Sequence, residues 1–307
     1  MNYLHLFRYK NLLLLALMQF LFRFGFLKFQ NCWLALTDFQ FVLLVLSTVL
    51  VAAGGYIINA IFDVDSDFEN QKKVIVGSKI SEKLAYNLYF GTTVTGVAIG
   101  FYLSNIIQKP SFAVLFILMA TLLYFYSTSL QQLPLIGNLV VAFLVSFSIL
   151  IIGIFDLYPA TYDGNQPQMR ILFSILLDYA VMAFIISIIR EIVKDLEDFE
   201  GDLSQGLRTL PIVLGSNRTA IVVAVATLLP VFLGIKYLND NLMENSLYWA
   251  SIYILITIIA PLLYVFVRLL SAKIKSDFSH ISNLLKLILL FGILSIVVLN
   301  QNILHHG

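Results

Sequence analysis

Residues 39–62 read FQFVLLVLSTVLVAAGGYIINAIF, and an acidic stretch begins directly after them at Asp63. The run contains no charged side chain and exceeds the roughly 20 apolar residues that a transmembrane helix needs. It therefore predicts a membrane-spanning helix that ends at an acidic, water-facing boundary. The Gly54-Gly55 pair inside the run predicts a point where a neighbouring helix packs closely, because small residues let two backbones approach.

Apolar runs of similar length fill most of the chain. Of the 307 residues, 60% are hydrophobic and 12% are charged, whereas soluble domains carry roughly 25% charged residues. So few charges cannot cover the surface of a water-soluble protein of this size. We expect a single all-α domain over residues 1–307, a polytopic membrane bundle of about nine transmembrane helices. The expected spans are residues 11–27, 39–62, 85–107, 111–129, 134–156, 171–191, 218–237, 246–270 and 284–303.

The basic side chains are unequally distributed between the two sides that these spans define. The side of the N-terminus and of the loops after the second, fourth, sixth and eighth spans carries Arg8, Lys10, Lys72, Lys73, Lys79, Lys83, Arg190, Lys194, Arg208, Arg218, Arg268, Lys273, Lys275 and Lys286. The other side carries only Lys28, Lys109, Arg170 and Lys236. Cytoplasmic loops are enriched in Lys and Arg. We therefore expect a multi-pass protein of a bacterial or archaeal cell membrane with its N-terminus in the cytoplasm.

Acidic residues concentrate where the second and sixth spans end. The two sets are Asn59, Asp63 and Asp67, spaced i, i+4 and i+8, and Asp195, Asp198 and Asp202, spaced i, i+3 and i+7. Residues at these spacings share one face of a helix, so each set should stack its side chains if its helix continues through it. Because both sets follow spans that run in the same direction, we expect both at the cytoplasmic side.

The side chains of these two sets suit a divalent cation. Stacked carboxylates repel one another, and Mg²⁺ binds one or two carboxylates together with phosphate oxygens. Two facing sets could hold metal ions on either side of a diphosphate. Nearby cations would neutralise the remaining phosphate charge, and the candidates are Lys72, Lys73, Arg190, Lys194 and Arg208.

A related pattern follows both acidic sets. The first set is followed by Ile75-Val-Gly77-Ser-Lys79, and the second by Val213-Leu-Gly215-Ser-Asn217. The two segments are separated by four spans and have the same expected orientation. This similarity indicates a weak internal duplication.

The acidic motifs resemble the two signatures of UbiA-type intramembrane prenyltransferases. The likeness lies in Asn59-xxx-Asp63-xxx-Asp67, in Asp195-xx-Asp198-xxx-Asp202, and in their places after the second and sixth spans. The run from Lys194 to Asp202 is most similar to members that act as geranylgeranylglycerol-phosphate geranylgeranyltransferases.

This resemblance implies a role for each motif residue. Asn59, Asp63 and Asp67 would hold one Mg²⁺, and Asp198 and Asp202, assisted by Asp195, would hold another, which makes Asp63, Asp67, Asp198 and Asp202 the catalytic candidates. Lys72 or Lys73, Lys194 and Arg208 would contact the diphosphate. The implied reaction is Mg²⁺-dependent transfer of a prenyl group from an allylic prenyl diphosphate to a lipophilic acceptor. Geranylgeranylglyceryl phosphate is the first choice of acceptor, and 4-hydroxybenzoate or naphthoate is the alternative.

Three positions depart from the family pattern. Ala60 stands where an Asp is common, and the stretch Lys72-Lys73-Val74 lacks the usual Pro. Gln131, five residues after Tyr126, stands where the family often has a Lys. These differences preserve the two-metal scheme but leave open which cations bind the phosphates.

Two other classes of function stay open. A secondary transporter also uses intramembrane acids, although it tends to place them near the bilayer midplane in broken helices. A non-catalytic lipid-binding relative would keep the fold and one metal site. The expected partners are the prenyl diphosphate, the lipophilic acceptor and membrane lipid, and the sequence implies neither nucleic acid nor an obligate protein partner.

Overall fold

The computed structural model describes residues 2–69, 74–204 and 206–306, and within these ranges the chain is helical without a β-strand. The expected all-α fold is confirmed. The chain divides into two compact units. Unit 1 comprises Met1–Phe20, Cys32–Val140 and Ser148–Leu176, and unit 2 comprises Leu21–Asn31, Val141–Phe147 and Leu177–Gly307. A single domain over residues 1–307 stays a prediction.

The long helices follow the apolar runs of the sequence. They are α2 (Tyr9–Phe24), α3 (Asp38–Phe62), α5 (Glu82–Ile106), α6 (Ala113–Thr128), α7 (Ile136–Ile152), α8 (Gln166–Glu197), α11 (Ser216–Tyr237), α12 (Tyr248–Ile254), α13 (Ala260–Ser271) and α14 (Lys275–His306). A π-helical turn, Leu255–Ile259, joins α12 to α13. Eight segments of the described chain are long and apolar enough to cross a membrane. The third expected span, residues 85–107, corresponds to α5, which has 25 residues but is not among those eight, since its Thr, Tyr and Asn side chains lower its mean hydropathy.

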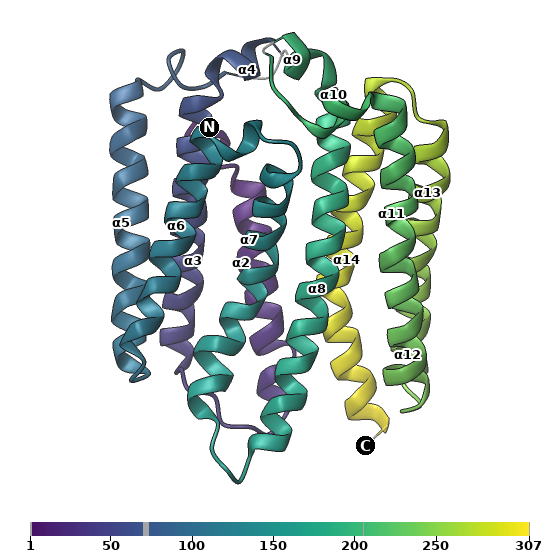
Figure 1. Ribbon diagram of the computed structural model, residues 1–307. Coiled ribbons are helices and arrows are strands. Elements are labelled where there is room, and N and C mark those ends of the chain that lie inside the picture. Colours follow the sequence, from purple (N-terminus) through teal and green to yellow (C-terminus); the bar gives the residue numbers. More distant parts are fainter. Residues whose placement is uncertain (1, 70–73, 205, 307) are drawn as a thin grey trace. The chain divides into compact units, whose positions relative to one another are not determined.

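The centre of unit 1 is α3, which packs beside α5 and α6 (Figure 1). Its start is fixed by a capping box, in which the Thr37 hydroxyl accepts from the Gln40 N–H and the Gln40 side chain accepts from the Thr37 N–H. Its middle depends on small residues. A Cβ on Gly55 would lie 2.6 Å from Leu123 Cδ2 of α6, too close for two carbon atoms. The predicted close packing at the glycine pair is confirmed.

Both acidic sets lie at bends and not on continuous helices. Helix α3 ends at Phe62, Asp63 has φ −91° and ψ 10°, and α4 (Val64–Glu69) begins anew. Likewise α8 ends at Glu197 and α9 (Phe199–Ser204) begins after Asp198. The condition for stacking, a helix that continues through the set, is therefore not met in either case. Aspartate has a low helix propensity because its short polar side chain competes for backbone hydrogen bonds, and a bend also relieves repulsion between stacked carboxylates.

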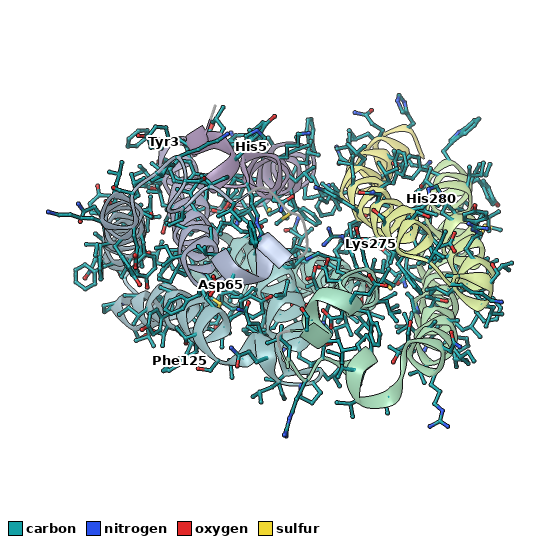
Figure 2. The ribbon with its side chains drawn as sticks, turned by 90° about the horizontal axis from the view of Figure 1, so that it is seen from above. Tyr3, His5, Asp65, Phe125, Lys275 and His280 are labelled. Carbon is teal, nitrogen blue, oxygen red and sulfur yellow. The ribbon has the colours of Figure 1, made fainter. Side chains whose placement is uncertain are left out.

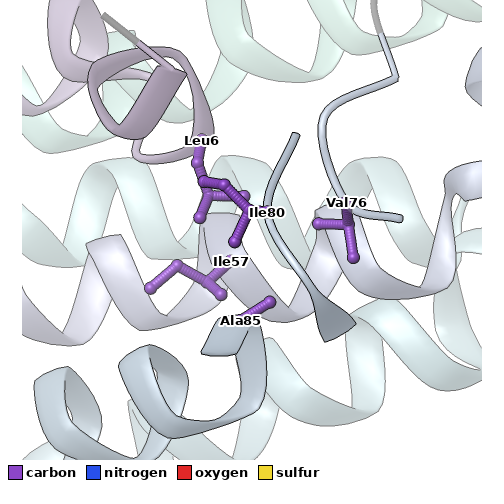
Figure 3. Packing of buried hydrophobic residues seen from close by; sticks show 5 residues of the cluster. All are labelled: Leu6, Ile57, Val76, Ile80 and Ala85. Carbon is purple, nitrogen blue, oxygen red and sulfur yellow. The ribbon is translucent and has the colours of Figure 1, made fainter. Parts of the chain in front are cut away.

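A small apolar cluster closes the end of unit 1 that carries Asp63. Leu6 of α1 (Asn2–Leu6), Ile57 of α3, Ala85 of α5 and the loop residues Val76 and Ile80 pack together (Figure 3). Within the loop, the Gly77 N–H donates to the Ile80 carbonyl at 2.9 Å. Burial of these side chains fixes the described part of the loop after the first acidic set against the last turns of α3.

In unit 2, α11 packs along α13, and α14 packs along α12 and α13 (Figure 1). Polar contacts fix α14: its Asn302 side chain accepts from the Ala250 N–H at 2.9 Å, and its Ser295 hydroxyl lies 2.8 Å from the Tyr179 hydroxyl of α8. The turn before α11 contains Gly215 with φ 87°, and the matching turn of unit 1 contains Gly77 with φ 81°. Positive φ is readily adopted only by glycine, so the two turns share a backbone requirement that supports the internal duplication.

Candidate active site

The first acidic set is built around the Asp63 carboxylate. Asn59 lies in the last turn of α3 and is 7% exposed, and Asp63 is the residue that ends this helix. The Asn59 side-chain amide donates to Asp63 Oδ2. Gln131 Nε2, from the turn η3 (Leu130–Gln132) after α6, donates to Asp63 Oδ1 at 2.8 Å. Two neutral amides therefore orient both oxygens of one carboxylate.

Asp67, Lys72 and Lys73 are the other residues predicted to act in this region. The backbone of Asp67 lies in α4, and its side chain is outside the described part of the chain, as are Lys72 and Lys73 altogether. Asp65, also on α4, is exposed and is labelled in Figure 2, which views the helices from the end that carries α1 and α4. In unit 1, two of the predicted metal ligands, Asn59 and Asp63, thus lie in contact, and Gln131, which was not predicted as a site residue, also contacts Asp63.

The second acidic set spans the bend between α8 and α9 in unit 2. Asp195 lies in the last turn of α8 and Asp198 at the bend, both partly exposed. Asp202 is in α9 and only 7% exposed. The Asp198 N–H donates to the Lys194 carbonyl at 2.9 Å, and the Asp202 N–H donates to the Asp198 carbonyl at 3.0 Å. Backbone hydrogen bonds of α-helical spacing thus flank the bend on both sides.

Two of the basic residues of this region, Arg190 and Lys194, share the carboxylate of Glu191, for which the sequence analysis predicts no role. Glu191 is 8% exposed, and it accepts from Arg190 Nη1 at 2.8 Å and from Lys194 Nζ at 2.9 Å. Arg190 Nε is buried and has no partner among the described residues. The spacing of Glu191 and Lys194, three residues apart on α8, was a usable signal for this contact. The fifth predicted cation, Arg208, is exposed.

The two acidic sets offer only oxygen ligands. Among the described residues, no group of three or more His, Cys, Asp or Glu side chains is gathered closely enough to hold a metal ion. Mg²⁺ does not require one, because it usually binds one or two carboxylates and takes its other ligands from water and phosphate. A carboxylate oxygen has two lone pairs, and an amide donor on Asp63 leaves room for a cation. The residues fit Mg²⁺.

Comparison with known proteins gives a family assignment. The model of the UbiA prenyltransferase family matches residues 25–290 of the chain. A digeranylgeranylglyceryl phosphate synthase of Thermococcus gammatolerans is 35% identical over 202 residues, which cover 64% of this chain and 65% of the relative. The corresponding synthase of Thermococcus sibiricus is 35% identical over 225 residues, or 70% of this chain and 74% of the relative. The matched region therefore spans just under two thirds of the first relative.

Solved structures share the fold over nearly the whole chain. A structure from a study of digeranylgeranylglyceryl phosphate synthase in membranes matches with a TM-score of 0.69 and 22% identity, covering 98% of both chains. A UbiA homologue from Archaeoglobus fulgidus bound to DMAPP and Mg²⁺ matches with a TM-score of 0.59 and 19% identity, covering 96% of this chain and 99% of that one. At these identities the likeness concerns the fold.

Proposed function

Because this chain belongs to the UbiA prenyltransferase family, we propose that it transfers a prenyl group from an allylic prenyl diphosphate to a lipophilic acceptor in a Mg²⁺-dependent reaction. The first choice of acceptor is geranylgeranylglyceryl phosphate, which would make the product an ether lipid precursor. The names of the relatives support this choice, and the homologue with bound DMAPP and Mg²⁺ supports the cofactor. The observation that carries the proposal is the Asp63 carboxylate held by Asn59 and Gln131 at the end of α3.

The motif residues divide into two ligand sets. Asn59, Asp63 and Asp67 would hold one Mg²⁺, and Asp198 and Asp202, with Asp195 assisting, would hold the second. When bound, the metal ions neutralise the diphosphate and stabilise it as a leaving group. The proposal requires the two sets to converge on one diphosphate, at the cytoplasmic side that the distribution of basic residues indicates.

The protein's own side chains then complete the reaction. The carbon–oxygen bond between the allylic carbon and the diphosphate breaks, and its electron pair leaves with the diphosphate. Arg190 and Lys194, already oriented by Glu191, together with Lys72 or Lys73 and Arg208, donate charge-assisted hydrogen bonds to the departing oxygens. The acceptor hydroxyl oxygen bonds to the allylic carbon, and its proton passes to a carboxylate, for which Asp198 is the candidate. The apolar helices exclude water, which would otherwise capture the allylic cation.

The test is an assay with purified protein in lipid nanodiscs, labelled geranylgeranyl diphosphate and each candidate acceptor in turn. We expect an ether product with geranylgeranylglyceryl phosphate, loss of turnover with EDTA, and recovery with added Mg²⁺. Asp63→Ala and Asp198→Ala should each lower turnover at least about 100-fold, the scale of removing one group that stabilises developing charge. Glu82→Ala, at an exposed carboxylate at the start of α5, is the matched control and should retain activity.

Each alternative function predicts a different result in the same assay. Product formation exclusively with 4-hydroxybenzoate or naphthoate would replace the ether lipid by an aromatic acceptor and leave the metal scheme intact. Diphosphate binding without turnover would indicate a non-catalytic lipid-binding relative. Full turnover in EDTA would refute the metal-dependent mechanism.

A further inference from the structure

We propose that Gln131 is a positioning residue that orients the Asp63 carboxylate for metal binding without offsetting its negative charge. This inference rests on the function proposed above, because it concerns the first of the two metal sites. It starts from a contact between residues 68 positions apart: Gln131 Nε2 donates to Asp63 Oδ1 at 2.8 Å. Partners that hydrogen-bond to a ligating carboxylate commonly control metal affinity.

The amide of Gln131 is held in one orientation. Its Nε2 donates to Asp63 Oδ1 and also to the Ser127 carbonyl of α6 at 3.2 Å. A primary amide has two N–H donors, and these two acceptors use both of them. The carbonyl of α6 thus fixes the plane of the amide, and the amide in turn fixes Asp63 Oδ1, while Asn59 fixes Oδ2 from the other side.

The backbone around Gln131 is equally constrained. Leu135, between η3 and α7, has φ 66°, a left-handed conformation that costs a bulky residue energy and persists only where the surroundings enforce it. At the start of α7, a Cβ on Gly137 would lie 2.9 Å from Gln131 Cα and 3.1 Å from the Leu130 carbonyl oxygen. Only glycine therefore allows α7 to approach the turn this closely, and the close approach holds Gln131 in place under Asp63.

The neutrality of Gln131 has a consequence for the metal. An ammonium group at the same distance from Asp63 would form an ion pair with it and repel a divalent cation. A glutamine supplies a hydrogen-bond donor without adding a positive charge beside the metal. A substitution at Gln131 should therefore change metal affinity before it changes anything else.

The test measures Mn²⁺ binding to the purified protein by electron paramagnetic resonance, in the absence of any prenyl substrate. The expected wild-type result is two Mn²⁺ sites per chain. Gln131→Met, which keeps the length and removes the donors, should weaken one site about tenfold, the lower end of the effect of removing such a partner. Gln131→Lys should weaken it further. Gln132→Met, the same change at the exposed neighbouring residue, is the matched control and should bind as the wild type.

Two further measurements separate orientation from general damage. Gly137→Ala moves the Gln131 backbone and changes no polar group, so it should also weaken that one Mn²⁺ site. In the activity assay, Gln131→Met should raise the Mg²⁺ concentration needed for half-maximal turnover and nearly recover the wild-type rate at saturating Mg²⁺. A misfolded variant would lose both sites and would not recover.

The outcomes also distinguish this inference from the function on which it rests. If Asp63→Ala removes one Mn²⁺ site and Gln131→Met binds like the wild type, the role of Gln131 is wrong and the metal scheme stands. If Asp63→Ala leaves both sites unchanged, the first metal site of the proposed function is itself wrong.

Discussion

Removing Glu191 should destabilise unit 2 by disconnecting the two cations that it holds. Glu191 accepts from Arg190 at 2.8 Å and from Lys194 at 2.9 Å. The side chain of Glu191 is only 10% exposed, whereas those of Arg190 and Lys194 are 22% and 34% exposed. The carboxylate is thus desolvated, and the cations keep part of their hydration.

This geometry sets the size of the effect. A hydrogen bond to a charged group contributes about 1.5–3 kcal/mol in a protein interior, and partial exposure of the cations lowers each contribution to about 1 kcal/mol. Glu191→Ala should therefore cost about 2 kcal/mol, or a fall of about 3 °C in Tm for a chain of this size. Glu191→Gln keeps one carbonyl acceptor and should cost about half as much.

The assay is a double-mutant cycle on thermal unfolding in detergent micelles. Glu191→Ala, Lys194→Ala and the double variant should give a coupling free energy of about 1 kcal/mol. Glu200→Ala, at an exposed carboxylate of α9, is the control and should leave Tm nearly unchanged. A coupling energy indistinguishable from zero would refute the reasoning, because the ion pair would then contribute nothing beyond its separate parts.

Two further predictions concern packing and thiol chemistry. Gly55→Ala places a Cβ against Leu123 of α6 and should destabilise the protein by about 1–3 kcal/mol. The control is Gly91→Ala, which has nothing within 4 Å of the added Cβ and should leave Tm unchanged or higher. Equal Tm values for the two variants would contradict this prediction. Burial and then the negative charge of Asp156 raise the pKa of the Cys32 thiol. A higher pKa leaves less thiolate at a given pH, so alkylation by iodoacetamide should reach half its maximal rate at a higher pH than for a free cysteine. Asp156→Asn should shift that midpoint back downwards, and an unchanged midpoint would show that the carboxylate has no influence.

The sequence by itself determined the helical membrane bundle and the positions of its two acidic motifs. A run such as residues 39–62 has one stable solution in a bilayer, since a helix satisfies every backbone hydrogen bond within the segment. The Gly54-Gly55 pair acts locally, and the structure confirms the close packing that it favours. The two acidic motifs could also be recognised from the sequence, because residue type and spacing are properties of the chain itself.

Only the tertiary structure decided how those motif residues are held. Spacing along a helix suggested a straight stack through Asp63, yet the chain bends there and the carboxylate turns to an amide from another helix. The contact between Gln131 and Asp63 joins positions 68 residues apart, and no local period encodes such a distance. It arises because α6 packs against α3 and because Gly137, at the start of α7, allows close contact with Gln131 in the turn η3 after α6. The local sequence determines where helices form, whereas the partner of the Asp63 carboxylate depends on which helices pack together.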